Sequence, residues 1–267
     1  MKPSDLSKEQ KEELEKFGAN TWFVEYLHKL YEENPSEVPE QWRSFFTGEN
    51  STSNNGHSAK ENNSSNLALP KNISMPEPSK EDEVKVIAGS SAKILDNMTA
   101  SLTIPTATSQ RVVPVKLLEE NRTLINNHLK KTASGKISFT HIISWAILKA
   151  VNNFPAINNS FTIINGKPHL IERTNVNLGL AIDIEKKDGS HSLIVPNIKN
   201  ANTMNFREFW KKYEDLVQRT RKGLIDPSEF MGTSITLTNP GTLGTVSSVA
   251  RLMIGQGAII ATGAIQY

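Results

Sequence analysis

Near the start of the chain, apolar side chains recur at intervals of three and four residues, which is the spacing of one helix face. The residues on this face are Trp22, Phe23, Tyr26, Leu27, Leu30 and Tyr31. Asn20 or Thr21 is placed to cap this helix, Asn34-Pro35 ends it, and a second short helix is expected over residues 39–46. A segment of roughly 40 residues cannot bury so many aromatic groups within itself. The face therefore docks either on a partner enzyme or on the folded remainder of its own chain.

The pattern divides the chain into three parts: a helical docking arm over residues 1–46, a linker over residues 47–85 and a larger domain over residues 86–267. The linker is dense in Ser, Asn, Pro, Lys and Glu and nearly free of aromatic residues. Such a composition cannot offset the entropy cost of ordering by burial, so we expect a disordered tether. His57 within it is interpreted as a solvated residue.

In the larger domain, helical and strand-like patterns alternate, which is typical of an α/β domain with a mixed sheet. The expected helices are 90–101, 115–129, 139–152 and 206–222, and the expected strands are 161–164, 167–171, 178–184, 193–196, 234–238 and 258–262. Asn165-Gly166 and Asp188-Gly189 separate β-prone runs and predict hairpins. Ser138 or Thr140 is placed to cap one helix, and Gly223 is a natural residue to end another.

Composition removes several function classes. The 267 residues carry 30 basic and 28 acidic side chains, a net charge of +2, which calls for no nucleic-acid partner. Without Cys there is no disulfide framework and no thiolate nucleophile. The charged first residues do not resemble a signal peptide, and no apolar run reaches the ~18 residues that would span a membrane. We therefore expect a cytoplasmic protein that binds neither membranes nor nucleic acid.

The polar groups with most chemical promise lie near the end of the chain. Thr236 and Thr238 alternate with apolar residues, so both hydroxyls share one face of the expected strand. Asn239-Pro240-Gly241 then breaks the strand. A hydroxyl beside free backbone N–H groups at a strand end is suited to stabilise an oxyanion. The alternative is that both are ordinary strand threonines.

Several long runs carry a resemblance to a known family. Residues 97–151, which contain TASLTIPTATSQRVVPV, residues 175–206, and residues 232–267, which contain ITLTNPGTLGT and GQGAIIATGAI, resemble the acyltransferase catalytic domain of 2-oxo acid dehydrogenase complexes. The match is to the form fused to a thiamine-dependent component in multifunctional 2-oxoglutarate decarboxylase/dehydrogenase enzymes. Residues 17–46 resemble the start of the 2-oxoglutarate dehydrogenase thiamine component.

The resemblance implies a chloramphenicol acetyltransferase-like fold and succinyl transfer from dihydrolipoamide to coenzyme A in the citrate cycle. It implies as partners the lipoyl domain of a partner acyltransferase, a complex with dihydrolipoamide dehydrogenase, and further copies of the chain, since the family's site lies between subunits of a trimer. Thiamine diphosphate and Mg²⁺ would bind only to the parent's thiamine-dependent region, which these residues do not contain. The alternative is a non-catalytic scaffold that oligomerises and docks partners of the complex.

The same resemblance assigns roles to particular residues. In the family, a strand reading Phe-Thr, then Ile or Leu, then Ser or Thr, then Asn supplies the oxyanion donor, which here is Thr238, with Thr236 as its rival. Asn239, and Arg111 and Lys93 beside the run 99–111, are the candidates for binding coenzyme A. Gly257 would let backbone approach the pantetheine arm, although tight strand packing explains it equally well. Surface solvation is the alternative for the two cations.

The family's general base is a His in an H-x-x-x-D-G motif, and no such motif occurs in these residues. We therefore expect a C-terminally incomplete domain that lacks the catalytic His. His128 and His141, at helix ends, are interpreted as structural, and Asp188 and His191 as solvated loop residues.

Overall fold

The structure is a computed structural model that describes residues 16–17, 20–47, 78–87, 90–132, 135–185 and 191–266. Several expectations therefore fall outside the described residues. They are the start of the arm, most of the linker with His57, and the Asp188-Gly189 turn. The backbone of Lys93 is described, but its side chain is not.

The helices lie close to their expected positions. They are α2 (Thr21–Glu33), α3 (Glu40–Thr47), α4 (Ser90–Ser101), α5 (Lys116–Lys131), α6 (Phe139–Asn153) and α7 (Phe206–Arg221). Short 3₁₀ turns join the elements: η3 (Pro35–Glu37), η4 (Pro155–Asn158), η5 (Ala201–Thr203), η6 (Pro227–Phe230) and η7 (Pro240–Leu243). Gly223, with φ +71°, follows the C-cap of α7 as expected. The alternative caps of α6 resolve to Ser138, whose hydroxyl accepts from the backbone N–H of His141.

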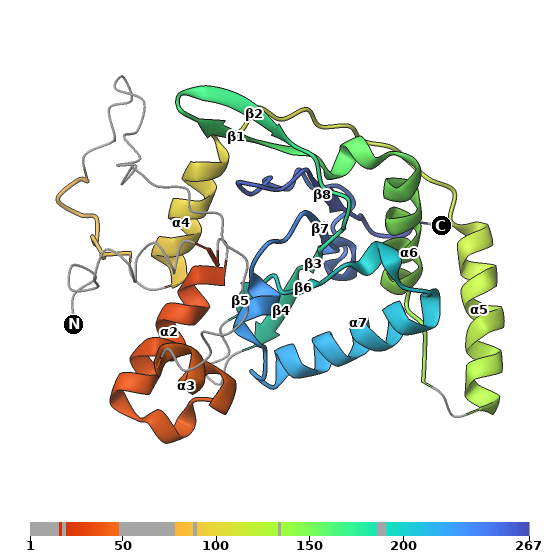
Figure 1. Cartoon of the computed structure of the whole chain (residues 1–267), viewed down its shortest axis with the longest axis horizontal. Coiled ribbons are helices and arrows are strands. Elements are labelled where there is room, and N and C mark those ends of the chain that lie inside the picture. Colours follow the sequence, from red (N-terminus) through yellow and green to blue (C-terminus); the bar gives the residue numbers. More distant parts are fainter. Residues whose placement is uncertain are drawn as a thin grey trace.

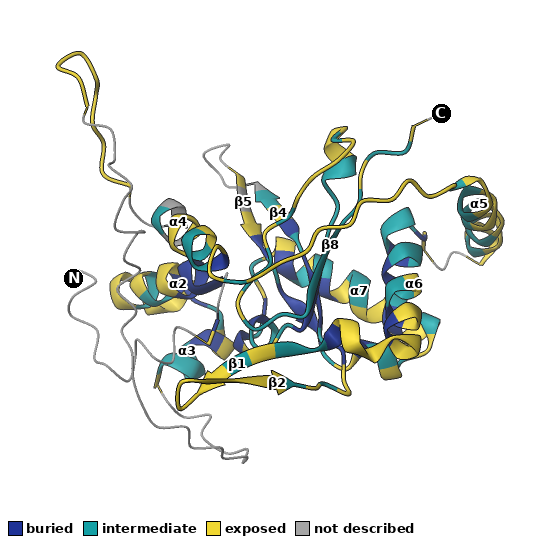
Figure 2. Cartoon of the chain, turned by 90° about the horizontal axis from the view of Figure 1, so that it is seen from above, coloured by how far each residue is buried: buried dark blue, intermediate teal, exposed yellow. Residues whose placement is uncertain are grey.

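A mixed four-stranded sheet lies at the centre, in the order β6 (Asn197–Ile198), β3 (Leu178–Leu180), β7 (Ile235–Thr238), β8 (Ala258–Ala261). β7 runs parallel to both of its neighbours, and β6 is antiparallel to β3. Helices α6 and α7 lie beside this sheet (Figure 1). Their inward side chains join Leu178, Ile235 and Leu237 of the sheet in one buried core (Figure 2). The expected α/β class with a mixed sheet is confirmed.

The expected single strand 178–184 is wrong, because it divides between two sheets, and the expected strand 193–196 overlaps β5 only at 193–194. β3 belongs to the central sheet, whereas β4 (Ile182–Glu185) pairs only with β5 (His191–Ile194) in a separate antiparallel ribbon. Ala181 is the point of transfer, and its N–H still donates to Leu237 O of the central sheet. The loop assignment of His191 is corrected as well, since His191 begins β5 and its Nδ1 lies 2.6 Å from Asp183 Oδ2.

The hairpin of β1 (Ser160–Ile164) and β2 (Lys167–Ile171) is confirmed at the expected turn. Asn165 and Gly166 both have positive φ, at 52° and 73°, as the tight turn of a two-residue hairpin requires. The two strands pair only with each other, so the hairpin forms a separate two-stranded sheet.

The N-terminal module, defined as Phe17 with α2 and α3, packs on the domain of its own chain. Trp42 is fully buried and its Nε1 donates to Ile225 O at 2.6 Å. The rings of Phe23 and Phe230 lie 5.5 Å apart. Of the two docking alternatives, the described contacts show the second. Asn20 stands at the N-cap of α2 but does not cap it, because its amide both accepts from Val195 N and donates to Val195 O.

Candidate functional site

The end of β7 separates its two threonines. Thr236 is buried and its hydroxyl donates to Gln256 Oε1 at 2.8 Å, so this side chain is occupied within the fold. Thr238 is half-buried, and its hydroxyl makes no hydrogen bond with any described residue. Its backbone oxygen accepts from Thr262 N at 3.0 Å, which fixes the strand end against the end of β8. Of the two hydroxyls, that of Thr238 is the one left available.

The loop after β7 is held against the segment after β8. Gly241 N donates to Thr262 O, and a Cβ added to Gly241 would lie 2.3 Å from the backbone carbon of Gly263. Only a glycine permits this approach, so the loop adopts one tight course beside Thr238. Near it, the hydroxyl of Thr262 is buried without a partner among the described residues. An unpaired buried hydroxyl is costly, so it requires an explanation such as a bound water or a functional role.

Asn239 extends the site toward α6. Its side-chain Nδ2 donates to Thr140 Oγ1 at 2.9 Å, which joins residues 99 positions apart in the sequence. Thr140 lies in the first turn of α6, next to the buried His141. The sequence indicates Thr140 only as a possible cap of α6, and no local pattern indicates its bond to Asn239. The structure therefore adds a residue to the site.

His141 confirms the structural interpretation made from the sequence. Its Nδ1 accepts from the backbone N–H of Ser138 at 3.0 Å, which completes a capping box, and burial lowers its pKa to about 4. Nε2 lies 2.9 Å from Glu214 Oε1, but off the line of a good hydrogen bond. A neighbouring carboxylate would favour the charged ring, yet a protonated Nδ1 would lose the capping box. We therefore describe this His as neutral.

The other candidates for binding coenzyme A are less well supported by contacts. Arg111 is exposed in the extended segment before α5, and among the described residues its guanidinium donates only to the neighbouring Gln110 O. Lys93 lies in α4. A Cβ added to Gly257 would lie 2.5 Å from Ile157 O, so this glycine is needed where β8 passes close to η4. The contact at Gly257 is the tight packing that the sequence left as its second explanation.

The described residues contain no group of three or more His, Asp or Glu side chains arranged to hold a metal ion. None of the described helices combines the length and the apolar character needed to cross a membrane.

Comparison with known proteins gives matches along the chain. Residues 79–267 match the family described as 2-oxoacid dehydrogenases acyltransferase (catalytic domain), and residues 16–52 match the 2-oxoglutarate dehydrogenase N-terminus. A multifunctional 2-oxoglutarate metabolism enzyme of Mycolicibacterium vanbaalenii is 40% identical over 94% of this chain and 24% of its own length. The chain thus spans about a quarter of the length of the curated relatives it matches.

Solved structures give the same fold. A probable dihydrolipoamide acetyltransferase of Listeria monocytogenes superposes with a TM-score of 0.59 and 25% identity, covering 70% of this chain and 77% of the other. A dihydrolipoamide acetyltransferase of Azotobacter vinelandii gives 0.62 at 20% identity, over 72% and 78%. With the mixed sheet and the match over residues 79–267, these findings show that the chain belongs to the family of 2-oxoacid dehydrogenase acyltransferase catalytic domains.

Proposed function

We propose that these residues form the N-terminal part of a multifunctional 2-oxoglutarate enzyme, and that their larger domain serves succinyl transfer from dihydrolipoamide to coenzyme A. The similarity to the mycobacterial relative over 94% of the chain supports the first statement. Membership of the acyltransferase family supports the second. The choice of a succinyl group rests on the 2-oxoglutarate relatives rather than on a contact in the domain.

The observation that carries the proposal is the free hydroxyl of Thr238 at the end of β7. Acyl transfer between two thiols needs a base that removes a thiol proton and a donor that stabilises the tetrahedral oxyanion. Thr238 is suited to the second role, because its hydroxyl has no partner among the described residues while that of Thr236 is bonded to Gln256. Asn239, the next residue, supplies a second polar side chain at the same place.

The donor set at this strand end fits the neutral, amide-containing pantetheine arm of coenzyme A better than its phosphates. Thr238 and Asn239 are uncharged, and Arg111 lies outside their described contacts. The phosphates would need basic groups, for which Arg111 and Lys93 remain candidates. Thiamine diphosphate and Mg²⁺ are proposed to bind to a thiamine-dependent region that these 267 residues do not contain.

The proposal predicts no acyl transfer by these 267 residues alone. General-base catalysis is worth ~10²–10⁴-fold, and the chain has no H-x-x-x-D-G motif to supply the base. Thioester absorbance with dihydrolipoamide and succinyl-coenzyme A measures the rate. A rate within about tenfold of an intact relative, that is about 1.4 kcal/mol in barrier height, would reveal another base and contradict this prediction.

Thr238 is tested in the longer protein that carries the base. Thr238→Ala should lower turnover by on the order of 10²–10³-fold, as expected for loss of one oxyanion donor. Thr236→Ala is the matched control on the same strand face, and it should instead lower thermal stability through loss of the bond to Gln256. If Thr236→Ala removes turnover and Thr238→Ala does not, the roles are reversed.

The partners proposed are the lipoyl domain of another acyltransferase, dihydrolipoamide dehydrogenase and further copies of the chain in a trimer. A non-catalytic scaffold is the second candidate function. It is favoured by the exposed apolar side chains of the β1–β2 hairpin, among them Phe161, Ile163 and Leu170. Turnover by the longer protein distinguishes the two, because a scaffold would assemble without it.

A further inference from the structure

We infer that Thr140 is a positioning residue: it holds the side-chain amide of Asn239 by its nitrogen, so that Asn239 Oδ1 accepts a hydrogen bond from an amide N–H of the pantetheine arm. The inference rests on the proposed function, because it takes coenzyme A as the ligand of this strand end. It goes further by naming the atom that receives the ligand and the residue that prepares that atom.

The first step is the geometry of the Asn239 amide. Its Nδ2 donates to Thr140 Oγ1 at 2.9 Å, and its Oδ1 makes no hydrogen bond with any described residue. Both side chains are half-buried. Because a carboxamide is planar, fixing the nitrogen also fixes the oxygen. An oxygen held in this way can accept from a ligand without the entropy cost of ordering the side chain at binding.

The second step is that Thr140 is itself held in place. It lies in the first turn of α6, inside the capping box formed by Ser138 and His141. Its carbonyl oxygen accepts from Ser144 Oγ at 2.6 Å. Thr140 is therefore part of a hydrogen-bonded helix start, which fixes the backbone position from which its hydroxyl extends.

The third step is the support from α7. The ring of Tyr213 packs edge-on against His141, with 4.3 Å between the centroids. Burial, and then the charge of Glu214, raise the pKa of Tyr213 to about 12, against the lowering effect of a hydrogen bond with Thr140. The phenol stays protonated over the working pH range. A protonated Tyr213 and a neutral His141 give Thr140 a setting that changes little with pH.

The chemistry of Asn239 Oδ1 indicates which group of the ligand it binds. Oδ1 of an asparagine only accepts hydrogen bonds, so its partner must be a donor. The pantetheine arm carries amide N–H groups close to its thiol, whereas the donors of the nucleotide, its amino and hydroxyl groups, lie at the end of coenzyme A far from the thiol. Asn239 directly follows Thr238, which is assigned to the thioester oxygen. An acceptor beside the oxyanion donor is therefore placed to bind the arm rather than the nucleotide.

The test is a calorimetric titration of the intact chain with two probes, coenzyme A and adenosine 3′,5′-bisphosphate, which lacks the pantetheine arm. Thr140→Val keeps the shape of the side chain and removes the hydroxyl. This variant should weaken the binding of coenzyme A by about three- to tenfold, the equivalent of one hydrogen bond, and leave the affinity for the bisphosphate unchanged. Thr140→Ser restores the hydroxyl and should restore the affinity.

Thr123→Val is the matched control, because the Thr123 hydroxyl bonds only Glu119 O within the exposed α5. It should change neither affinity. The inference is overturned if Thr140→Val leaves coenzyme A binding intact, or if it weakens both probes equally, which would mean a structural role. If the unaltered chain binds the bisphosphate and coenzyme A equally well, the arm is not held and the inference fails while nucleotide binding stands. If it binds neither probe, the proposed function fails and the inference with it.

Discussion

Two regions of the molecule differ in how far their apolar side chains are buried. On the side of the N-terminal module, Phe17 and Trp42 are buried against the domain. In the β1–β2 hairpin and in α5, which lie apart from each other, apolar side chains remain exposed, among them Phe161, Ile163 and Leu124. Figure 1 shows the module and α5 at opposite ends of the molecule. The main aromatic side chains of the module are covered within the chain, whereas those of the hairpin and α5 are not.

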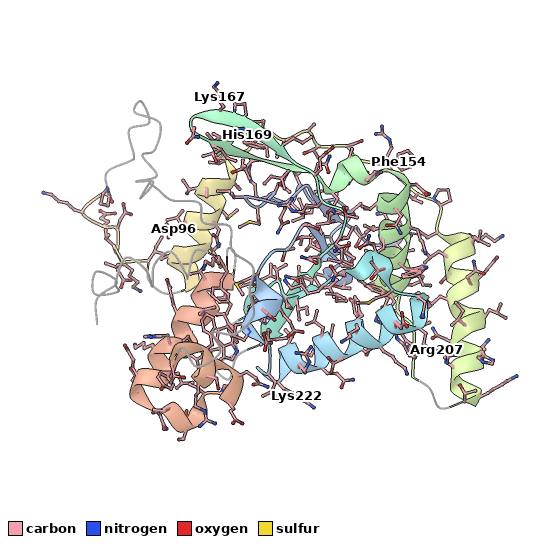
Figure 3. The ribbon with its side chains drawn as sticks, viewed as in Figure 1. Asp96, Phe154, Lys167, His169, Arg207 and Lys222 are labelled. Carbon is pink, nitrogen blue, oxygen red and sulfur yellow. The ribbon has the colours of Figure 1, made fainter. Side chains whose placement is uncertain are left out.

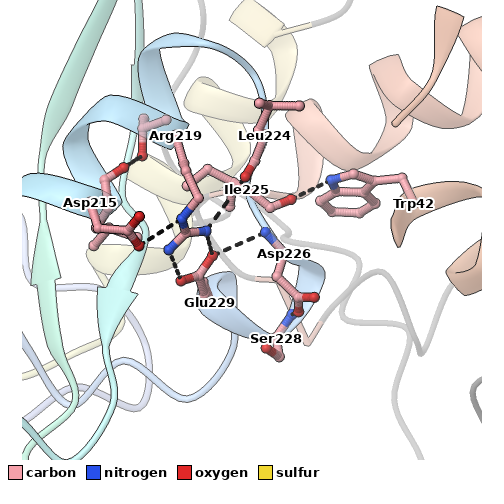
Figure 4. A network of polar contacts seen from close by, with 10 residues as sticks. Trp42, Asp215, Arg219, Leu224, Ile225, Asp226, Ser228 and Glu229 are labelled. Atoms are coloured by element: carbon pink, nitrogen blue, oxygen red, sulfur yellow. Dashed lines mark hydrogen bonds and ion pairs between the residues drawn. The ribbon is translucent and has the colours of Figure 1, made fainter. Parts of the chain in front are cut away.

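Around the N-terminal module, the fold is held by polar as well as apolar contacts. Arg219 of α7 makes a two-pronged ion pair with Glu229, both contacts at 2.6 Å, and also bonds Asp215 at 2.8 Å (Figure 4). The hydrogen bonds with Glu229 chiefly hold the pKa of Arg219 above its usual range. The same network leads through the Leu224–Ile225 backbone to Trp42. Such planar paired contacts fix orientation as well as adding energy.

The β1–β2 hairpin and α5 are only loosely packed against the rest of the described chain. α5 has no buried residue, and the hairpin pairs with no other strand in the described chain. Lys167 in the hairpin and Phe154 after α6 point away from the body of the molecule at separate places (Figure 3). An isolated two-stranded hairpin is only marginally stable in water, and exposed apolar patches usually mark interaction sites. The N-terminal module therefore packs on its own domain, whereas the hairpin keeps an exposed apolar surface, to which we propose that a further copy of the chain binds.

Disrupting the packing of the N-terminal module should give the largest loss of stability. Trp42→Ala removes a fully buried ring and its bond to Ile225 O, so it should lower the free energy of unfolding by about 3–5 kcal/mol. Chemical denaturation followed by circular dichroism measures this loss. Tyr26→Ala, in the same module but 58% exposed, is the control and should stay within ~0.5 kcal/mol. Equal effects of the two would mean that the module does not pack as described.

Cutting the ion pair should give a smaller loss. Glu229→Gln keeps the size of the side chain and removes the charge that pairs with Arg219, so we expect a loss of about 1–3 kcal/mol in unfolding free energy. Asp215→Asn, whose contact is more exposed, should cost under ~1 kcal/mol. A reversed order in thermal denaturation would refute the assignment of Glu229 as the main partner.

The pH dependence of stability follows from His141. Burial lowers its pKa to about 4, below the ordinary 6.5, so the unfolded chain binds more protons between these values. Stability should therefore be full above about pH 6.5 and fall toward pH 4, by on the order of 1–2 kcal/mol between pH 7 and 5. The pKa of Glu214, which burial raises, acts in the opposite direction and reduces the fall.

The matched variants separate His141 from the remaining groups. His141→Gln removes the titration, so the melting temperature should change less with pH than in the unaltered chain. His169→Gln, on the exposed face of the hairpin, should leave the pH profile as it was. An unchanged slope for His141→Gln would show that another group causes the dependence.

Changing the exposed face of the β1–β2 hairpin should have the smallest effect on folding stability. Phe161→Ser replaces a side chain that is 45% exposed, so the unfolding free energy should change by no more than ~1 kcal/mol. Self-association, measured by analytical ultracentrifugation at micromolar concentration, should weaken by about tenfold if this face binds a second copy. A monomeric unaltered chain would contradict the assignment of this face.

Much of this arrangement could be predicted from the sequence. The helical and strand patterns gave the α/β class, and Asn165-Gly166 located the hairpin, because these features depend on nearby residues. The alternating run 178–184 predicted extended chain correctly but not its division at Ala181. Alternation records which side chains are buried and not which sheet a strand joins.

In the candidate site, too, local sequence patterns predicted which residues take part, whereas contacts between distant segments came only from the structure. The sequence placed Thr236 and Thr238 on one face and left their roles open. Burial of Thr236 and its bond to Gln256 distinguish them, and both depend on the course of the loop before β8. The bonds of Asn20 to Val195 and of Asn239 to Thr140 join segments far apart in the sequence. No local pattern indicates such partners.

We propose that coenzyme A binds where β7 and β8 end, at Thr238 and Asn239, and not at the N-terminal module. Hydrogen–deuterium exchange of the intact chain, with and without saturating coenzyme A, tests it most directly. We predict slower exchange over residues 236–241 and 256–262, with no change in α2 and α3. Protection confined to other segments, or none anywhere at saturation, would contradict the claim.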